Sequence, residues 1–191
     1  PKYVKSQSLK KRLFSRFISL NYSIPWYTPV LYKNNVSISE LKENKFLTFI
    51  PFFIYCNVTV ENVKHSKNNP IKFLCVAKYE KRKGLEKLIE AVNNLCNSGY
   101  NFKISIVGST GTEGREEYFT AIKNLINKKN LEETISILKN VPHKEMGSLF
   151  KSHDVFILPT TKELASVSQL EAMSYGLAII CSRDNGTAHY I

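Results

Sequence analysis

The sequence predicts an α/β fold: a Rossmann-like, doubly wound parallel sheet with helices on both faces. Two observations in residues 71–191 support this class. Short apolar runs alternate with longer segments whose apolar residues recur at helical spacing. This alternation occurs five times along the chain, and consecutive parallel strands of one sheet need a crossover connection that is usually a helix.

The first strand is expected at 72–77 (KFLCVA) and the second at 102–107 (FKISIV). Between them lies an apolar stripe at helical spacing, which should end at Gly99: Leu85, Leu88, Ile89, Val92 and Leu95. The next helix is expected to begin among acidic residues that suit the positive end of the helix dipole: Glu113, Glu116 and Glu117. Its core stripe and its basic end then follow: Tyr118, Ile122, Leu125, Ile126, Lys128 and Lys129.

A third strand is expected at 134–138, and a fourth at 155–158. Pro142 lies between them and should occupy the first turn of a short helix, because proline is favoured where the backbone N–H has no partner within the helix. The pattern of a buried strand followed by a helix therefore continues through the middle of the chain.

Ser166 is expected to cap a further helix, with Gln169 three residues later completing a capping box. Gly176 should end this helix before a fifth strand at 177–182. In doubly wound sheets, ligands bind at the carboxyl ends of the strands. The search for a site therefore concentrates on the loops that leave those ends: 78–84, 108–113, 139–142 and 159–166.

Residues 1–70 are irregular and rich in aromatic side chains. We expect 1–60 to be the end of a separate domain and 61–70 to be a polar linker. Residues 8–20 place apolar side chains on one helical face and basic ones around it. Such a helix suits either an anionic membrane or packing on another domain. The apolar run 46–55 is too short to span a bilayer.

Composition narrows the function classes. The 191 residues are 43% hydrophobic and 23% charged, as in an ordinary globular protein. The net charge of +11 indicates an anionic partner: nucleic acid, acidic lipid or a phosphorylated substrate. The four cysteines lack C-x-x-C spacing, so we expect free thiols in a reducing compartment rather than disulfides or zinc ligands. The histidines also lack metal-ligand spacing.

Two of the four loops have features of a phosphate site. Residues 77–84 (AKYEKRKG) carry four cations, and paired cations suit a diphosphate, although a solvated lysine-rich turn has the same composition. Residues 108–114 (GSTGTEG) are glycine-rich and open a helix, whose amides could cradle an anion. They form neither G-x-G-x-x-G nor a P-loop, which argues against a dinucleotide dehydrogenase and a P-loop ATPase.

Two glutamates bracket the start of the helix that Ser166 caps. Glu163 belongs to the preceding loop, Glu171 lies about a turn and a half into the helix, and backbone amides near Val167 lie between them. Acceptors around a set of donors suit a polyhydroxylated, phosphorylated ligand. Surface charge is the ordinary alternative, but the position after a buried strand favours a site. A glycosidase pair would need one protonated carboxyl, of which the sequence gives no sign.

Taken in order, residues 71–191 resemble the donor-binding domain of the retaining family-4 glycosyltransferases, the glycosyl transferases group 1 set with a GT-B fold. The segments that carry the resemblance are Ala77-Lys78 with Lys83-Gly84, Ile106-Val-Gly108, Val141-Pro-His-Lys-Glu145, His153-Asp-Val-Phe-Ile-Leu-Pro159, Glu163-x7-Glu171, Ala172-Met-Ser-Tyr-Gly176 and Asn185-Gly-Thr187. The resemblance implies a nucleotide-sugar-binding domain at 71–191. This would be the C-terminal half of a GT-B fold, incomplete at its C-terminus and preceded by part of the acceptor-binding domain. We expect such a fragment to have little or no activity alone.

The resemblance also implies a role for each site residue. Two cations, Lys78 and Lys83, would bind the diphosphate in place of a metal ion. Glu163 would bind hydroxyls of the donor sugar, and Glu171 would accept from the nucleotide ribose. Backbone positions would line the rest of the donor site: Gly108, Val141, Ala165, Ser166 and Val167.

The implied activity is transfer of a sugar from a nucleotide sugar, with UDP the expected nucleotide, to a glycan or lipid-linked acceptor. Retention of configuration, a role in cell-surface polysaccharide synthesis, and no metal, cofactor or protein nucleophile are implied with it. The expected location is the cytoplasm, including the inner face of the membrane. Three positions depart from the family: Lys78 replaces an arginine and loses its bidentate fork, Ala165-Ser166 replaces Phe-Gly, and Lys139 replaces a glycine. The alternative is a basic nucleic-acid- or anionic-membrane-binding module without catalysis.

Overall fold

A computed structural model describes residues 70–191, apart from 162, 164, 184 and 189–190. The expectations for the N-terminal part of the chain concern a domain at 1–60, a linker and a basic amphipathic helix. They lie outside the described residues, except for Pro70 at the end of the linker. They remain predictions, as does the boundary at residue 71.

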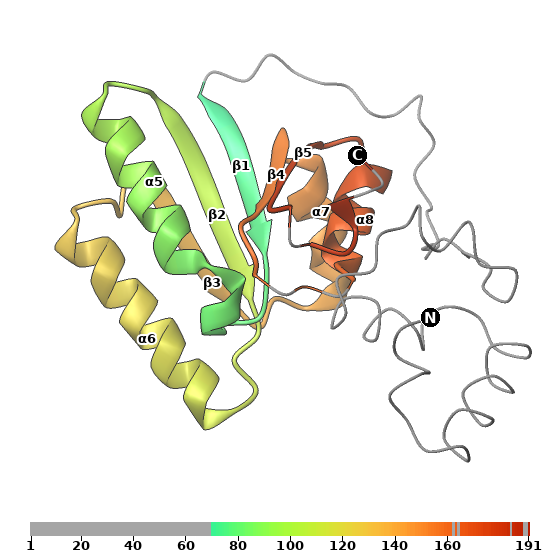
Figure 1. The fold of residues 1–191 in the computed structure, drawn as a ribbon, viewed down its shortest axis with the longest axis horizontal. Coiled ribbons are helices and arrows are strands. Elements are labelled where there is room, and N and C mark those ends of the chain that lie inside the picture. The colour runs from blue at the N-terminus through green and yellow to red at the C-terminus, as the bar shows by residue number, and fades with distance from the viewer. Residues whose placement is uncertain (1–69, 162, 164, 184, 189–190) are drawn as a thin grey trace, which may run out of the picture. The chain divides into compact units, whose positions relative to one another are not determined.

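The described part forms one parallel sheet with the strand order β3-β2-β1-β4-β5 (Figure 1). The strands are β1 (Ile71–Val76), β2 (Phe102–Gly108), β3 (Ile135–Lys139), β4 (Val155–Leu158) and β5 (Ala178–Cys181). The order runs outward from β1 in one direction and outward from β4 in the other. The predicted doubly wound, Rossmann-like class is therefore confirmed.

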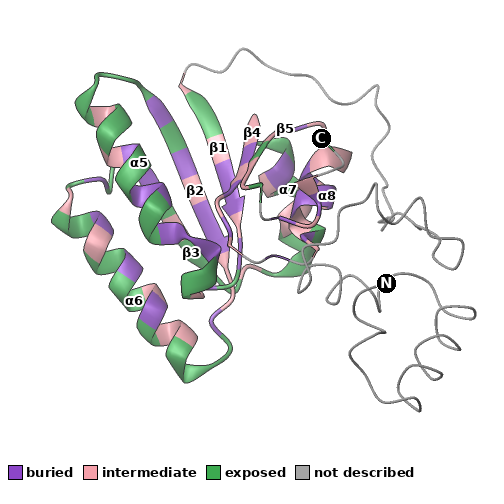
Figure 2. Ribbon diagram, viewed as in Figure 1, coloured by how far each residue is buried: buried purple, intermediate pink, exposed green. Residues whose placement is uncertain are grey.

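Helices cover both faces of this sheet. On one face lie α5 (Leu85–Asn97) and α6 (Glu113–Lys128), which contact each other. On the other lie α7 (His143–Lys151) and α8 (Val167–Ser174) (Figure 1). Leu74 and Cys75 in β1 are both fully buried, and successive strand residues point to opposite faces, so both faces must be covered there. Figure 2 shows buried residues concentrated on the strands and on the inner sides of the helices.

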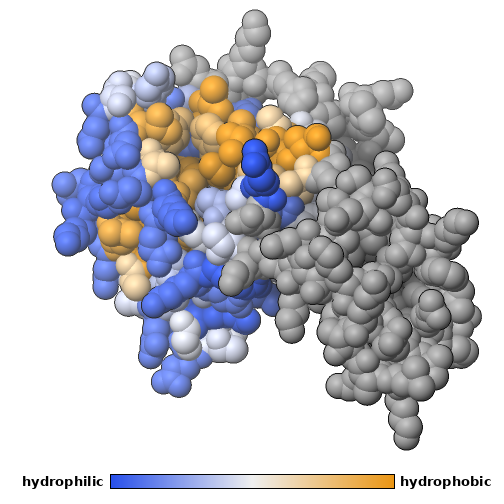
Figure 3. Space-filling view, in the orientation of Figure 1, coloured by the Kyte–Doolittle hydropathy of each residue, from blue (hydrophilic) through white to orange (hydrophobic). Residues whose placement is uncertain are grey.

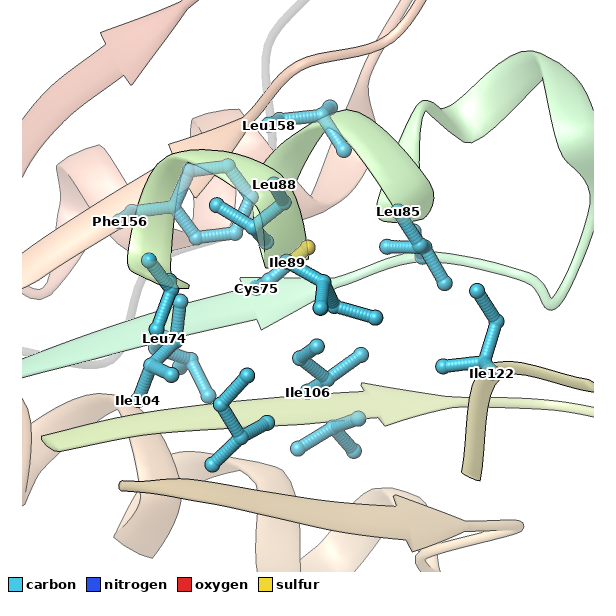
Figure 4. Close-up of a cluster of buried hydrophobic side chains, with 14 of the residues drawn as sticks. Leu74, Cys75, Leu85, Leu88, Ile89, Ile104, Ile106, Ile122, Phe156 and Leu158 are labelled. Carbon is cyan, nitrogen blue, oxygen red and sulfur yellow. The ribbon is translucent and has the colours of Figure 1, made fainter. Parts of the chain in front are cut away.

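The core beneath α5 contains the apolar stripe that the sequence predicted, except for Leu95, which is 44% exposed near the end of the helix. Figure 4 shows Leu85, Leu88 and Ile89 pointing from α5 toward the strands, where they meet side chains such as Cys75 and Ile106. Burial raises the pKa of the Cys75 thiol to about 12, which keeps it protonated and unreactive. Three of the four cysteines, Cys75, Cys96 and Cys181, are free thiols, as the sequence predicted. Cys56 lies outside the described residues.

The outer surfaces of the helices are polar. Figure 3 shows hydrophilic side chains over α5 and α6 and a group of apolar ones beside them over the strands. Among the described residues, exposed large apolar side chains include Ile71 of β1 and Ile180 of β5. None of the described helices is long and apolar enough to cross a bilayer.

Two further local predictions need correction. Pro142 does not occupy the first turn of α7 but precedes it as the N-cap, with ψ of 140°, and its carbonyl accepts from the Glu145 amide at 2.9 Å. The capping box at α8 forms only in part. Ser166 caps the helix and its Oγ accepts from the Gln169 amide at 3.2 Å, but the Gln169 side chain bonds elsewhere, as described below.

The strand order reverses between β1 and β4, and the loops that leave these two strands are packed tightly together. Gly84 has φ of +69°, and a Cβ there would lie 2.2 Å from the Pro159 carbonyl oxygen. A glycine is therefore required for both conformation and space. The contact joins the β1–α5 loop to the β4–α8 loop at the edge where such sheets bind ligands.

Replacing Gly84 by alanine should destabilise the fold more than the same change at Gly99. Both residues have positive φ, but nothing lies within 4 Å of a Cβ at Gly99. Gly99→Ala should lower the free energy of unfolding by about 1–2 kcal/mol through backbone strain alone. Gly84→Ala should lose about 2 kcal/mol more through the clash. Urea denaturation measures both, and equal losses would contradict the tight loop contact.

Candidate functional site

The β1–α5 loop contains a short 3₁₀ turn, Lys81–Lys83, that is bonded to the β4–α8 loop. The carbonyl of Arg82 accepts from the Thr161 amide at 2.8 Å and from the Thr160 hydroxyl at 3.1 Å. These bonds fix the backbone of the cationic turn against the residues that lead to Glu163. Two segments some eighty residues apart in sequence thereby share one edge of the sheet.

Lys83 and Glu163 meet at this junction. Both are buried, each with 8% of its surface exposed, and the Lys83 ammonium bonds Oε2 of Glu163. Arg82 Nη1 lies 3.2 Å from the same oxygen and the Thr160 hydroxyl lies 3.4 Å from it. The sequence predicted that Lys83 and Glu163 share a site. It did not predict that they bond each other directly, as buried opposite charges do to offset their loss of hydration.

The second oxygen of Glu163 is differently placed. No described residue bonds Oε1, whereas Oε2 is surrounded by donors. Among the described residues, no buried side-chain oxygen or nitrogen lacks a hydrogen-bond partner, so Oε1 must reach the surface. Glu163 therefore presents one free acceptor from a carboxylate whose orientation is fixed by its other oxygen.

The Lys78 side chain does not join this cluster. Lys78 is exposed at the start of the same loop, and no ion pair links it to any described residue. Tyr79 anchors the loop beside it: its side chain is fully buried and its hydroxyl donates to the Leu138 carbonyl at 2.6 Å. The loop backbone is thus fixed while the Lys78 ammonium stays in solvent.

The start of α8 offers free backbone donors. Ser166 is buried as the N-cap, Ala165 is half-buried, and 44% of the Val167 surface is exposed. No described residue accepts from the amides of Val167 and Ser168. Unpaired amides at a helix N-terminus favour an anion. These amides lie between Glu163 and Glu171 in the chain, at the helix start that the sequence predicted.

A buried network holds the residues after β5 against this loop. Gln169 is fully buried. Its side-chain Nε2 donates to the Thr187 carbonyl at 2.9 Å, and its side-chain Oε1 accepts from the side chains of Asn185 and Thr187. The Gly186 amide in turn donates to the Glu163 carbonyl at 2.8 Å. Gln169 therefore serves the Glu163 segment rather than a capping box. The sequence marked Asn185-Gly-Thr187 only through the resemblance.

Glu171 lies half-buried on α8. Burial raises the pKa of its carboxyl group, and the nearby His143 at the start of α7 opposes that shift. Val141 is half-buried against the core at the end of the loop after β3. A glycine is required at position 108 by packing alone, because a Cβ there would lie 2.0 Å from the Ala77 carbonyl oxygen.

Residues that sequence reasoning did not select extend the charged cluster. Glu80 bonds Arg82 through one oxygen, with Nε at 2.9 Å, and Arg115 through the other, with Nη2 at 2.6 Å. Burial alone would raise the pKa of Glu80, but the two guanidinium groups outweigh it and lower the pKa. Within the part of the chain that the structure describes, no three His, Cys, Asp or Glu side chains gather as a metal site would require.

Changing Glu171 to glutamine should stabilise the unliganded protein at pH 7 and not at pH 4. Because burial raises the pKa of Glu171 in the folded state, its ionised form opposes folding. That penalty is absent below the unfolded pKa, about 4.3, and grows as pH rises through the folded pKa. The gain should not exceed about 1 kcal/mol, because solvent screens a half-buried group. Urea denaturation at both pH values tests this, with exposed Glu117→Gln as control; a gain that grows toward acid would contradict it.

Comparison with known proteins identifies the family of the chain. The family model described as glycosyl transferases group 1 matches residues 59–191. The chain is 26% identical over 181 residues to the amylovoran biosynthesis glycosyltransferase AmsK of Erwinia amylovora, covering 85% of this chain and 43% of that protein. It is 22% identical over 159 residues to the capsular polysaccharide biosynthesis glycosyltransferase CapM of Staphylococcus aureus, covering 81% of this chain and 39% of that one.

A solved structure extends the likeness to the fold. A glycosyltransferase from Rickettsia africae superposes with a TM-score of 0.65 at 20% identity, over 89% of this chain and 51% of that one. The chain thus spans about half the length of this structure, and less than half of the two curated relatives. Its Rossmann-like sheet corresponds to part of a GT-B glycosyltransferase. With the family model covering most of its residues, this chain belongs to the glycosyl transferases group 1 family.

Proposed function

We propose that the protein transfers a sugar from a nucleotide-sugar donor to a glycan or lipid-linked acceptor, with retention of configuration, in cell-surface polysaccharide synthesis. The observation that carries this proposal is the buried pair of Lys83 and Glu163, where the loops after β1 and β4 meet. Membership of the family supports the class of reaction, and AmsK and CapM, named for amylovoran and capsular polysaccharide biosynthesis, support the setting.

The cationic turn is suited to the leaving group. When the bond between sugar and diphosphate breaks, negative charge develops on the departing nucleoside diphosphate. A fixed ammonium in a site of low polarity stabilises that charge far more than one in water does. Lys83 is buried and its position is fixed by Glu163. We assign Lys83 to the diphosphate, with Lys78 approaching from solvent and the amides after Ser166 on the same anion. No metal ion or other cofactor is needed in this scheme.

The carboxylates are suited to hydroxyl groups. Oε1 of Glu163 is a free acceptor beside the diphosphate position, so we assign it to a hydroxyl of the donor sugar. Glu171 is assigned to the nucleotide ribose, and the backbone near Val141 to the base. A half-buried carboxylate without a strong partner has a raised pKa, and hydroxyl donors from a ribose would restore the lost hydrogen bonds. Because no protein nucleophile is assigned, we propose attack by the acceptor on the face that the diphosphate leaves.

Nucleotide binding should depend on Lys83 and Glu171. We expect the intact protein to bind UDP and UDP-sugars in calorimetric titration. Lys83→Ala and Glu171→Ala should each weaken binding at least tenfold, about the value of one charge-assisted hydrogen bond. Exposed Lys87→Ala on α5 is the matched control and should bind normally. If both site variants bind UDP normally while the protein binds DNA with steep salt dependence, the alternative of a basic nucleic-acid module would replace this proposal.

A stability cycle separates binding from folding. Lys83→Met leaves the buried Glu163 carboxylate without its closest cation and should lower the free energy of unfolding by about 3 kcal/mol. Adding Glu163→Gln removes the uncompensated charge and should restore most of that loss. The double variant should therefore be folded yet bind UDP poorly. Recovery of UDP binding together with stability would show that Lys83 acts only in folding.

A further inference from the structure

Arg82 is held between two carboxylates at the mouth of the site. Its Nε donates to Glu80 Oε2 at 2.9 Å, and its Nη1 donates to Glu163 Oε2 at 3.2 Å. Its carbonyl is fixed by the Thr161 amide, and its side chain is still 44% exposed. The guanidinium group is therefore oriented from two sides while one edge remains open to solvent.

The partner that orients Arg82 is itself held in place. Glu80 Oε1 accepts from Arg115 at the start of α6, with Nε at 2.9 Å and Nη2 at 2.6 Å. A continuous series of ion pairs links α6 to the β4–α8 loop. Its members, in order, are Arg115, Glu80, Arg82, Glu163 and Lys83. The β1–α5 loop, the β4–α8 loop and the start of α6 thus share the network, and each contributes at least one charged side chain.

The charge of this network favours an added anion. Three cations and two carboxylates leave one excess positive charge. Two of the cations, Arg82 and Lys83, converge on a single oxygen of Glu163, and like charges that close repel each other. A guanidinium group has five N–H donors, of which the described residues engage two of Arg82. The unused donors belong to a guanidinium group that is bonded to the Glu163 carboxylate.

We propose that Arg82 is a diphosphate ligand of the donor site, and that Glu80 and Arg115 hold it in position. This inference rests on the proposed function. The phosphate that Arg82 meets is the one that carries the sugar, because Arg82 bonds the same carboxylate that we assign to the sugar. Arg82 supplies the planar bidentate fork that the exposed Lys78 does not have.

The ratio of UDP affinity to UMP affinity tests this role, because the two ligands differ only in the phosphate that Arg82 should bind. In the intact protein, Arg82→Gln should weaken UDP binding about ten- to a hundredfold and leave UMP binding nearly unchanged. Arg82→Lys keeps the charge but not the fork and should fall between. Glu80→Gln should lower the ratio by a smaller factor, since Arg82 then keeps only one anchor. Exposed Lys81→Gln, in the same turn, should leave it unchanged.

Each outcome decides between the two proposals. If the wild-type protein prefers UDP to UMP and Arg82→Gln keeps that preference, the role of Arg82 is wrong and the transferase proposal stands. If Arg82→Gln loses UDP and UMP binding equally and has a lower unfolding midpoint, Arg82 has only a structural role. That result would also overturn the proposal that Arg82 binds the diphosphate. If the wild-type protein binds neither ligand, the proposed function fails and this inference fails with it.

Discussion

The close approach of two loops at the centre of the sheet is the constraint on which the candidate site depends. Gly84 lies against the Pro159 carbonyl, in a space that no other side chain fits. The Arg82 carbonyl is bonded across the same gap to Thr161. Because these backbone contacts hold the β1–α5 turn against the β4–α8 loop, Lys83 and Glu163 are buried together rather than exposed separately. The site is thus a consequence of how β1 and β4 lie side by side.

Buried charge of this kind is an expensive way to stabilise a fold, since apolar side chains of similar volume often serve as well or better. Its presence at the strand ends is better explained by chemistry. The cations of the network outnumber its carboxylates, and one carboxylate oxygen remains free for a hydroxyl. This arrangement suits the ligand that we propose, an anion that also carries hydroxyl groups. A sugar diphosphate has both features.

A second hydrogen-bond network fixes the backbone of Glu163. Gln169 holds the turn at Asn185–Thr187, and that turn bonds the backbone of Glu163 through Gly186. The Glu163 carboxylate is therefore fixed by cations on one side and its backbone by an uncharged network on the other. This would matter for the proposed transfer reaction, because catalysis by fixed charges requires that they do not reorganise as the reaction proceeds.

The sequence by itself determined the elements and their order. Helical spacing from Leu85 onward, the cap at Ser166 and the stops at Gly99 and Gly176 depend on residues a few positions apart, so local rules predicted them, apart from the position of Pro142. Only the tertiary structure decided the partners of each charge. Arg82 bonds Glu163, which is 81 positions away in the sequence. The Gln169 side chain bonds the Thr187 carbonyl instead of completing the capping box. Lys78 and Lys83 look equivalent in sequence, yet one is exposed and the other buried. The reason is physical: burial and ion pairing depend on which strands lie adjacent in the sheet, and that adjacency is set by packing across the whole domain.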